Sequence, residues 1–256
     1  MSISNLGKQL QARPHALGIF VLSRDPFVME ACATTALDWL AFDMEAGAVG
    51  KADLLHFAQA CQGRRVLALA RIADSRPESV EQALDLGLSG VIIPKVNNAE
   101  IASKAAMACR FQPQGNRGVN PVRASDYFEN VATYFATANE NTLCIAQIES
   151  AEAIANVDEI AAISQIDGLF IGCGDLAMSL NTPGQVDSPP MRDAIAKVLA
   201  ACRRHGKLPG IFAYELDLAR RYLAEGFHFV AVGNDIKAVK NSISNWLTQV
   251  QTVSAQ

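Results

Sequence analysis

The stretch "LDWLAFDMEAGAVG", residues 37–50, begins as an apolar run and ends in a short polar segment that contains two acids. A continuously apolar run indicates a strand buried on both faces, as in a parallel sheet covered by helices. Because side chains alternate along a strand, Asp43 and Glu45 would point to the same side where this strand ends. The stretch therefore predicts a buried strand with acidic groups at its carboxyl end.

Similar apolar runs recur along the chain, with amphipathic stretches between them. The strand candidates are 16–22, 37–43, 66–71, 90–94, 142–148, 167–171, 208–212 and 228–232. The stretches between them have helical patterns, and "SVEQALDLG" is typical of a helix that ends at a glycine. With a last helix over 236–252, the pattern gives eight βα units, which favours an α/β fold of the TIM (β/α)8 barrel type. We expect one domain over 1–256.

The composition of the 256-residue chain excludes several classes of protein. Its net charge is −4 and it has no basic run, so neither nucleic acid nor an anionic membrane surface is an expected partner. No apolar run has membrane-spanning length, and the first residues lack the apolar core of a signal peptide, so we expect a cytoplasmic protein. The six cysteines form no C-x-x-C pair and are expected to be reduced core thiols, with Cys173 set apart by its glycine neighbours.

Active-site residues of a barrel lie where its strands end, and polar groups are concentrated there in this sequence. The candidates are Asp43, Glu45, Arg71, Pro94, Lys95, Gln147, Glu149, Gly172 to Asp175, Phe212, Gly233, Asn234 and Asp235. The long 110–141 region is a further candidate for a functional insertion. Its "QGNRG" turn resembles a phosphate-binding loop only weakly, because it does not lead from a strand into a helix.

Two of these groups of residues have more than one interpretation. Glu149 and Asp175 could together bind Mg²⁺ or Mn²⁺, because two carboxylates, waters and a substrate oxygen suit a hard cation. Alternatively, Glu149 pairs with an arginine and Asp175 caps the following helix. Arg71 could bind a substrate carboxylate, or it could pair with Asp43 or Glu45. These two roles can coexist.

Several longer motifs carry a resemblance to a known family. They are "DWLAFDMEA", the arginine of "ALAR", "FQPQGNRG", "AQIES", "DGLFIGCGDLA" and "GFHFVAVGND". Over nearly its whole length the chain resembles the HpcH/HpaI family of metal-dependent class II pyruvate aldolases. The resemblance implies a (β/α)8 barrel whose last helix is exchanged between subunits, and a homohexamer built as a trimer of dimers.

The resemblance also implies a lyase that acts on a 2-oxo acid such as pyruvate or oxaloacetate through a metal-stabilised enolate. The implied metal is Mg²⁺, Mn²⁺ or Co²⁺, and its ligands fall on Glu149 and Asp175. Arg71 is the residue that steadies the enolate charge, and Asp85 falls where the family has an aspartate that tunes its base. Together with the strand-end positions, it gives Arg71, Gln147, Cys173, Gly174, Asp175 and Phe212 as the expected substrate contacts.

The sequence departs from the family at the base, because the family has "D-x-E-H" where this chain has "DMEA" and Ala46 replaces the histidine. The "G-P-x-D" motif has become "GCGD". Three hypotheses follow. The chain is an aldolase that uses a metal-bound water, Glu45 or a substrate group as base, with Asp43 beside it. Alternatively, it resembles the metal-independent branch that condenses acetyl-CoA with oxaloacetate for siderophore synthesis, or it decarboxylates oxaloacetate. The third hypothesis is a 2-oxo acid binding protein without turnover.

Overall fold

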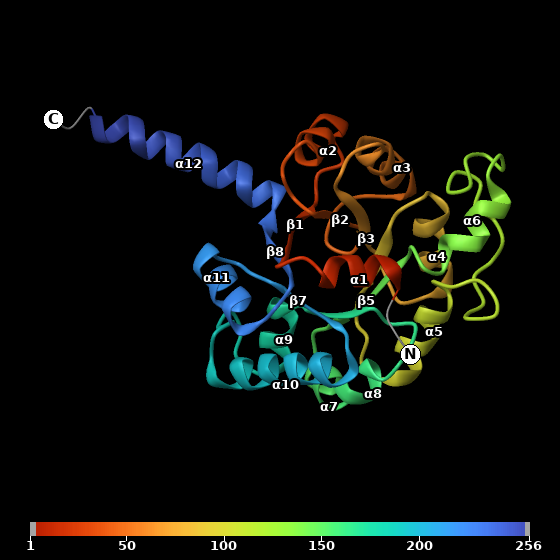
Figure 1. Ribbon diagram of the computed structural model, residues 1–256. Coiled ribbons are helices and arrows are strands. Elements are labelled where there is room, and N and C mark those ends of the chain that lie inside the picture. Colours follow the sequence, from red (N-terminus) through yellow and green to blue (C-terminus); the bar gives the residue numbers. More distant parts are fainter. Residues whose placement is uncertain (1–3, 254–256) are drawn as a thin grey trace.

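The computed structural model describes residues 4–253, and within them eight parallel strands close into a barrel in sequence order (Figure 1). The strands are β1 Ala16–Val21, β2 Trp39–Asp43, β3 Leu67–Arg71, β4 Gly90–Ile93, β5 Leu143–Ile148, β6 Gly168–Ile171, β7 Leu208–Phe212 and β8 Phe229–Asn234. Every predicted strand is present, and no bound differs from the expected one by more than two residues. The predicted TIM barrel is therefore confirmed.

Helices follow the strands and surround the barrel (Figure 1). They are α1 Asn5–Gln11, α2 Pro26–Ala33, α3 Lys51–Cys61, α4 Pro77–Asp85, α5 Ala99–Met107, α6 Val131–Ala138, α7 Ala151–Ala155, α8 Val157–Ala161, α9 Cys173–Ser179, α10 Pro189–His205, α11 Leu216–Glu225 and α12 Asp235–Val253. The predicted glycine stop lies after α4, where Gly87 has a φ of +84°. Glycine adopts this left-handed conformation without a steric penalty from Cβ.

Aromatic side chains fill the inside of the barrel. Trp39 stacks on Phe229 with ring centroids 4.2 Å apart, and its indole N–H donates to the carbonyl oxygen of Ala16 at 3.1 Å. A Cβ atom at Gly18 would overlap the Trp39 ring, so the glycine is what admits the tryptophan. A barrel of eight strands has an interior that side chains can fill, which leaves room for a ligand only at its ends.

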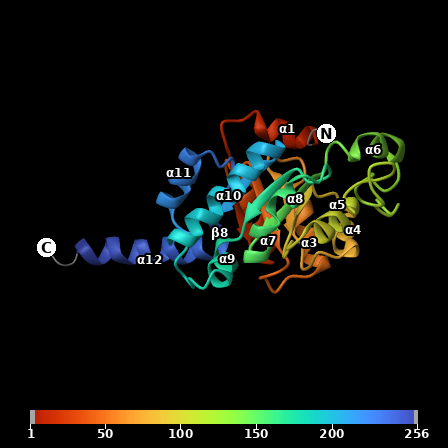
Figure 2. The ribbon, with the colours of Figure 1, turned by 90° about the horizontal axis from the view of Figure 1, so that it is seen from below.

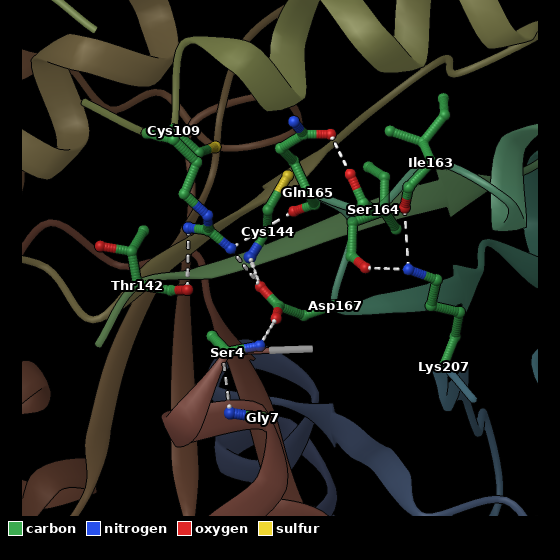
Figure 3. Close-up of polar contacts among 12 residues, drawn as sticks. Ser4, Gly7, Cys109, Thr142, Cys144, Ile163, Ser164, Gln165, Asp167 and Lys207 are labelled. Atoms are coloured by element: carbon green, nitrogen blue, oxygen red, sulfur yellow. Dashed lines mark hydrogen bonds and ion pairs between the residues drawn. The ribbon is translucent and has the colours of Figure 1, made fainter. Parts of the chain in front are cut away.

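A buried polar network closes the end of the barrel where α1 lies (Figure 2, Figure 3). Asp167 accepts hydrogen bonds from the backbone N–H of Ser4 at 2.6 Å and of Cys144 at 2.8 Å. Its carboxylate also pairs with Arg110 at 2.8 Å, and Arg110 donates to the carbonyl oxygen of Thr142 at 3.0 Å. Asp167 and Arg110 are 1% and 3% exposed, so each charge depends on the other. The network ties α1 to the start of β5 and β6.

Replacing Asp167 with alanine is expected to lower the free energy of unfolding by about 3–5 kcal/mol, because the Arg110 charge stays buried without its partner. The matched control is Asp158→Ala, which breaks a 2.6 Å ion pair with Arg204 whose side chains are both more than half exposed. This pair is expected to contribute at most about 1 kcal/mol. Urea unfolding measures both values, and equal losses in the two variants would contradict the role of the network.

The last helix, α12, projects away from the barrel (Figure 1, Figure 2). Its exposed apolar side chains are Ile236, Val239, Ile243, Trp246, Leu247 and Val250. The predicted 236–252 helix is thus confirmed, whereas its exchange between subunits stays a prediction. Within residues 4–253, no helix combines the length and the apolar character that crossing a membrane requires.

Candidate active site

A cavity of about 180 Å³ opens at the carboxyl ends of the strands. The predicted site residues that line it are Asp43, Arg71, Gln147, Cys173, Gly174, Asp175 and Phe212. They come from β2, β3, β5, β7 and the start of α9, so strand ends far apart in the sequence converge on one volume. Ala46 and Asn234 also line it. The cavity is therefore the candidate active site that the barrel topology predicts.

Arg71 is fixed at the end of β3 by two acids. Its guanidinium donates to both carboxylate oxygens of Asp43, at 2.9 and 2.6 Å, and lies 3.2 Å from the carboxylate of Glu45. Asp43 is 2% exposed and also accepts the backbone N–H of Ala46 at 3.1 Å. A guanidinium has five N–H groups, so these contacts leave donors for a ligand. The structural and the ligand-binding interpretations of Arg71 are thus compatible.

Glu149 lies beside the cavity in a buried hydrogen-bonded group. One of its carboxylate oxygens accepts the backbone N–H of Lys95 at 2.7 Å, and the other accepts a short hydrogen bond from the Gln147 side-chain amide. Glu149 is 5% exposed and has no ion pair within the described part of the chain. Its predicted alternative, a pair with an arginine, is therefore wrong. The carbonyl oxygen of the Gln147 amide is buried and has no hydrogen-bond partner among residues 4–253.

The electrostatics around Glu149 favour a bound cation. Burial raises the pKa of Glu149 to about 7, and the nearby carboxylates of Glu45 and Asp175 act in the same direction. The Lys95 backbone N–H and the Arg71 charge oppose this shift of the pKa. Negative charge is thus in excess at this point, and a divalent cation would stabilise the ionised carboxyl.

Asp175 lies in the first turn of α9 and is exposed at the cavity. Its side chain has no hydrogen bond or ion pair within residues 4–253, and it makes no cap at the start of its helix. The predicted alternative, a helix cap, is therefore wrong. Nearby, a Cβ atom at Gly172 would lie 2.7 Å from the Gln147 amide nitrogen and 2.8 Å from a Glu149 oxygen. Only glycine allows the backbone to approach these side chains so closely.

Cys173 lines the cavity but does not offer it a reactive thiol. Its side chain is 1% exposed and belongs to the core between the strands and the outer helices. Burial raises the pKa of the Cys173 thiol to about 12, although a hydrogen bond with Tyr222 opposes the shift. The thiolate is the reactive form of cysteine, so this group is chemically inert near neutral pH. All six cysteines are free, as predicted.

Asp85 lies apart from the cavity. Its carboxylate pairs at 2.6 Å with Arg117, whose guanidinium lies 4.6 Å from the centre of the Phe111 ring. The structure therefore does not bring Asp85 together with the other candidates. Arg117 belongs to the "QGNRG" turn, and its 1% exposed side chain has a structural partner, which agrees with the weak phosphate-loop signal.

The sequence reasoning missed three aromatic residues at the cavity, Phe20, Phe170 and Tyr214. Phe20 lies under the Arg71 guanidinium, 5.0 Å from the ring centre, and packs against Phe212 at 5.6 Å. Tyr214 follows β7 by two residues, and its ring contacts Phe212 at 4.9 Å. Its position just after a strand end could have identified it. However, "IFAYELD" is equally typical of a loop that leads into a helix.

Comparisons with known proteins agree with the fold and the motifs. The model of the HpcH/HpaI aldolase/citrate lyase family matches residues 16–242. The 5-keto-4-deoxy-D-glucarate aldolase of Klebsiella pneumoniae is 33% identical over 233 residues, which are 91% of each chain. The 2-dehydro-3,6-dideoxy-6-sulfogluconate aldolase of Pseudomonas putida is 33% identical over 242 residues, which cover 94% of this chain and 95% of the relative.

Among solved structures, an HpcH/HpaI aldolase/citrate lyase family protein from Burkholderia cenocepacia superposes with a TM-score of 0.89 at 28% identity. The superposition covers 97% of this chain and 99% of the other. The family model and the curated relatives extend over far more than half of the sequence. The chain therefore belongs to the HpcH/HpaI aldolase/citrate lyase family.

Proposed function

We propose that this protein is a carbon–carbon lyase that cleaves 4-hydroxy-2-oxo acids into pyruvate and an aldehyde. The observation that carries the proposal is the cavity, in which Arg71, Gln147 and Asp175 converge from separate strand ends while Glu149 lies beside them. Breaking the bond next to a ketone leaves an enolate, whose negative charge a fixed guanidinium stabilises in a site that excludes water. The two curated relatives described above are both aldolases.

Several residues of the cavity have a part in this reaction. Arg71 is held rigid by Asp43, so it meets the developing negative charge without reorganisation. The unpaired carbonyl oxygen of Gln147 leaves one polar group of the site for a bound ligand. The apolar walls formed by Phe20, Phe170 and Phe212 exclude water from the enolate.

The residues at the cavity fit a divalent metal. Glu149 and Asp175 would hold it, since the first is a buried carboxylate with an excess of negative charge around it and the second has no other partner. Within residues 4–253 no group of three or more His, Cys, Asp and Glu side chains gathers, so the other ligands would be waters and substrate oxygens. Mg²⁺ commonly keeps several waters in this way. When bound, such an ion polarises the ketone and offsets the enolate charge.

The metal assignment predicts how stability depends on pH. The pKa of Glu149 rises from 4.5 to about 7 on folding, so the stability that its protonated form contributes is present below pH 4.5 and is lost as pH rises through 7. The loss is at most about 3 kcal/mol. A bound cation would offset it, so Mg²⁺ should raise Tm more at pH 8 than at pH 5.5.

Thermal unfolding with and without Mg²⁺ measures this difference. Glu149→Gln should make the Mg²⁺ effect on Tm small at both pH values, whereas the control Glu152→Gln, an exposed glutamate of α7, should behave like the unmodified protein. An equal increase in Tm at pH 5.5 and pH 8 in the unmodified protein would contradict the assignment.

Among the described residues, no histidine lines the cavity to serve as a general base. Ala46 lines the cavity at the place where the resemblance puts the family's histidine. Glu45 is held between two cations, 3.2 Å from Arg71 and 3.2 Å from Lys95. Glu45 also does not line the cavity, so a role as base would require it to leave these partners.

The test of the proposal is the release of pyruvate from 4-hydroxy-2-oxobutanoate, the simplest acid of this class, with and without Mg²⁺. Metal-dependent release supports the lyase. Formation of citrate from oxaloacetate and acetyl-CoA in the presence of EDTA would instead favour the citrate-synthase alternative. Tight binding of pyruvate without any turnover would favour the binding protein, and either result would overturn the proposal.

A further inference from the structure

The lyase reaction needs a group that moves a proton on the aldehyde oxygen, and the cavity offers few candidates. No histidine or lysine lines it. The titratable residues that do line it are Asp43, Arg71, Cys173, Asp175 and Tyr214. Asp43 and Arg71 hold each other in a bidentate ion pair, and the Cys173 side chain is packed in the core. Only Asp175, assigned above to the metal, and Tyr214 then remain.

Tyr214 lines the cavity, and its hydroxyl lies against Gly174 in the first turn of α9. The side chain of Lys237 donates to the Tyr214 backbone carbonyl at 2.6 Å, and the ring packs against Phe212. The hydroxyl itself lies 2.6 Å from where a Cβ atom of Gly174 would be. It has no hydrogen-bond partner within the described residues 4–253, so its proton is free to engage a ligand.

The glycine at position 174 leaves room for the Tyr214 hydroxyl. Gly174 has an ordinary backbone conformation, and the only atoms near its missing Cβ belong to Tyr214, the hydroxyl oxygen at 2.6 Å and Cζ at 3.8 Å. Any larger residue would therefore displace the hydroxyl, while a phenylalanine ring at 214 would leave room for it. The glycine in "GCGD" thus accommodates the Tyr214 hydroxyl and has no other visible steric reason.

We propose that Tyr214 is a catalytic residue of this chain, whose hydroxyl exchanges a proton with the aldehyde oxygen of the substrate. In the addition direction, the enolate carbon attacks the aldehyde carbonyl carbon, the carbonyl π electron pair moves to oxygen, and this oxygen takes the phenol proton. The phenolate then regains a proton from water. In cleavage the phenol first gives its proton to water. The phenolate then takes the C4 hydroxyl proton, the C=O bond forms, and the electron pair of the C3–C4 bond enters the enolate.

The surroundings of Tyr214 suit a proton donor. Burial raises the pKa of its hydroxyl, and negative charge on Cys173 or Asp175 would raise it further, while Arg71 has the opposite effect. The phenol is therefore the resting form near neutral pH, and in the addition direction it gives its proton to an oxygen that becomes negatively charged. This inference rests on the proposed function, because the aldehyde oxygen belongs to the substrate of the lyase.

The test compares two reactions that share an enolate but differ in the proton. Cleavage of 4-hydroxy-2-oxobutanoate requires proton transfer from its hydroxyl, whereas decarboxylation of oxaloacetate forms the same enolate by loss of CO₂. Tyr214→Phe removes one oxygen atom and should lower kcat for cleavage by about 10²-fold. Its KM should change by less than about threefold, and its decarboxylation rate by less than about twofold, because a general acid–base group acts on the chemical step.

Gly174→Ala supplies a second, independent variant. Its methyl group should displace the Tyr214 hydroxyl and lower cleavage to a similar extent. Because the methyl group would meet no hydroxyl in a Tyr214→Phe background, the double variant should cleave no more slowly than Tyr214→Phe alone.

Cleavage by Tyr214→Phe within twofold of the unmodified protein would overturn the inference, and so would parallel losses of cleavage and decarboxylation, which indicate a structural role. Absence of both reactions in the unmodified protein would instead refute the proposed function itself.

Discussion

Replacing Arg71 with alanine is expected to lower kcat for pyruvate release by about 10²–10³-fold, the usual effect of removing one fixed group that stabilises an oxyanion. The reason is that Arg71 is the only cation that lines the cavity among the residues described. It is already fixed by Asp43 and lies over the Phe20 ring, so the free enzyme has its geometry in place. Steady-state kinetics with saturating Mg²⁺ measures the effect.

The control for this variant has to separate lost activity from lost stability, because the buried charge of Asp43 would lose its partner. Arg71→Ala combined with Asp43→Asn removes this uncompensated charge, and the double variant should unfold at a temperature closer to that of the unmodified protein. Arg71→Lys keeps a positive charge but cannot reproduce the planar contact that two guanidinium nitrogens make with Asp43, so it should also lose activity. A folded alanine variant with near-normal turnover would contradict the role of Arg71.

Replacing Asp175 with alanine is expected to lower kcat by at least about 10²-fold and to remove the response of the residual activity to Mg²⁺. Asp175 is exposed and has no partner in the described chain, so its loss should change the free energy of unfolding by less than about 0.5 kcal/mol. Activity is measured over a Mg²⁺ titration, in which the variant should give a flat response.

Asp193→Ala is the matched control for Asp175, since it removes an exposed aspartate on α10 that lies away from the cavity. Its kcat and its Mg²⁺ dependence should equal those of the unmodified protein. An Asp175→Ala variant that stays active with an unchanged Mg²⁺ response would show that the metal, if required, is held elsewhere.

Much of the barrel could be predicted because its strands are local patterns. Runs such as 37–43 are apolar on both faces, and each is followed by a helical period, so type and order follow from the sequence alone. The end of the barrel closed by α1 could not be predicted in this way. It depends on the contact between Ser4 and Asp167, which are 163 residues apart, and on a helix of only seven residues. The spacing of apolar residues along the chain does not predict a contact between residues so far apart in the sequence.

The candidate site was predictable to the extent that strand ends converge in a barrel. Arg71, Gln147 and Asp175 could be named because polar residues are concentrated at the ends of otherwise apolar strands. The sequence does not predict the direction in which a side chain points. Cys173 was therefore expected to contact the substrate, although its thiol packs into the core. Tyr214 was missed for a similar reason, since its approach to Gly174 depends on the packing of the β7 end against α9.

The most direct test of the proposed site is a crystal structure of the protein with Mg²⁺ and pyruvate at saturating concentrations. We expect pyruvate in the cavity, with its oxygens about 3 Å from Arg71 donors, and the ion bound by Glu149 and Asp175. Pyruvate ordered outside this cavity, or an ion that contacts neither carboxylate, would contradict the proposed function.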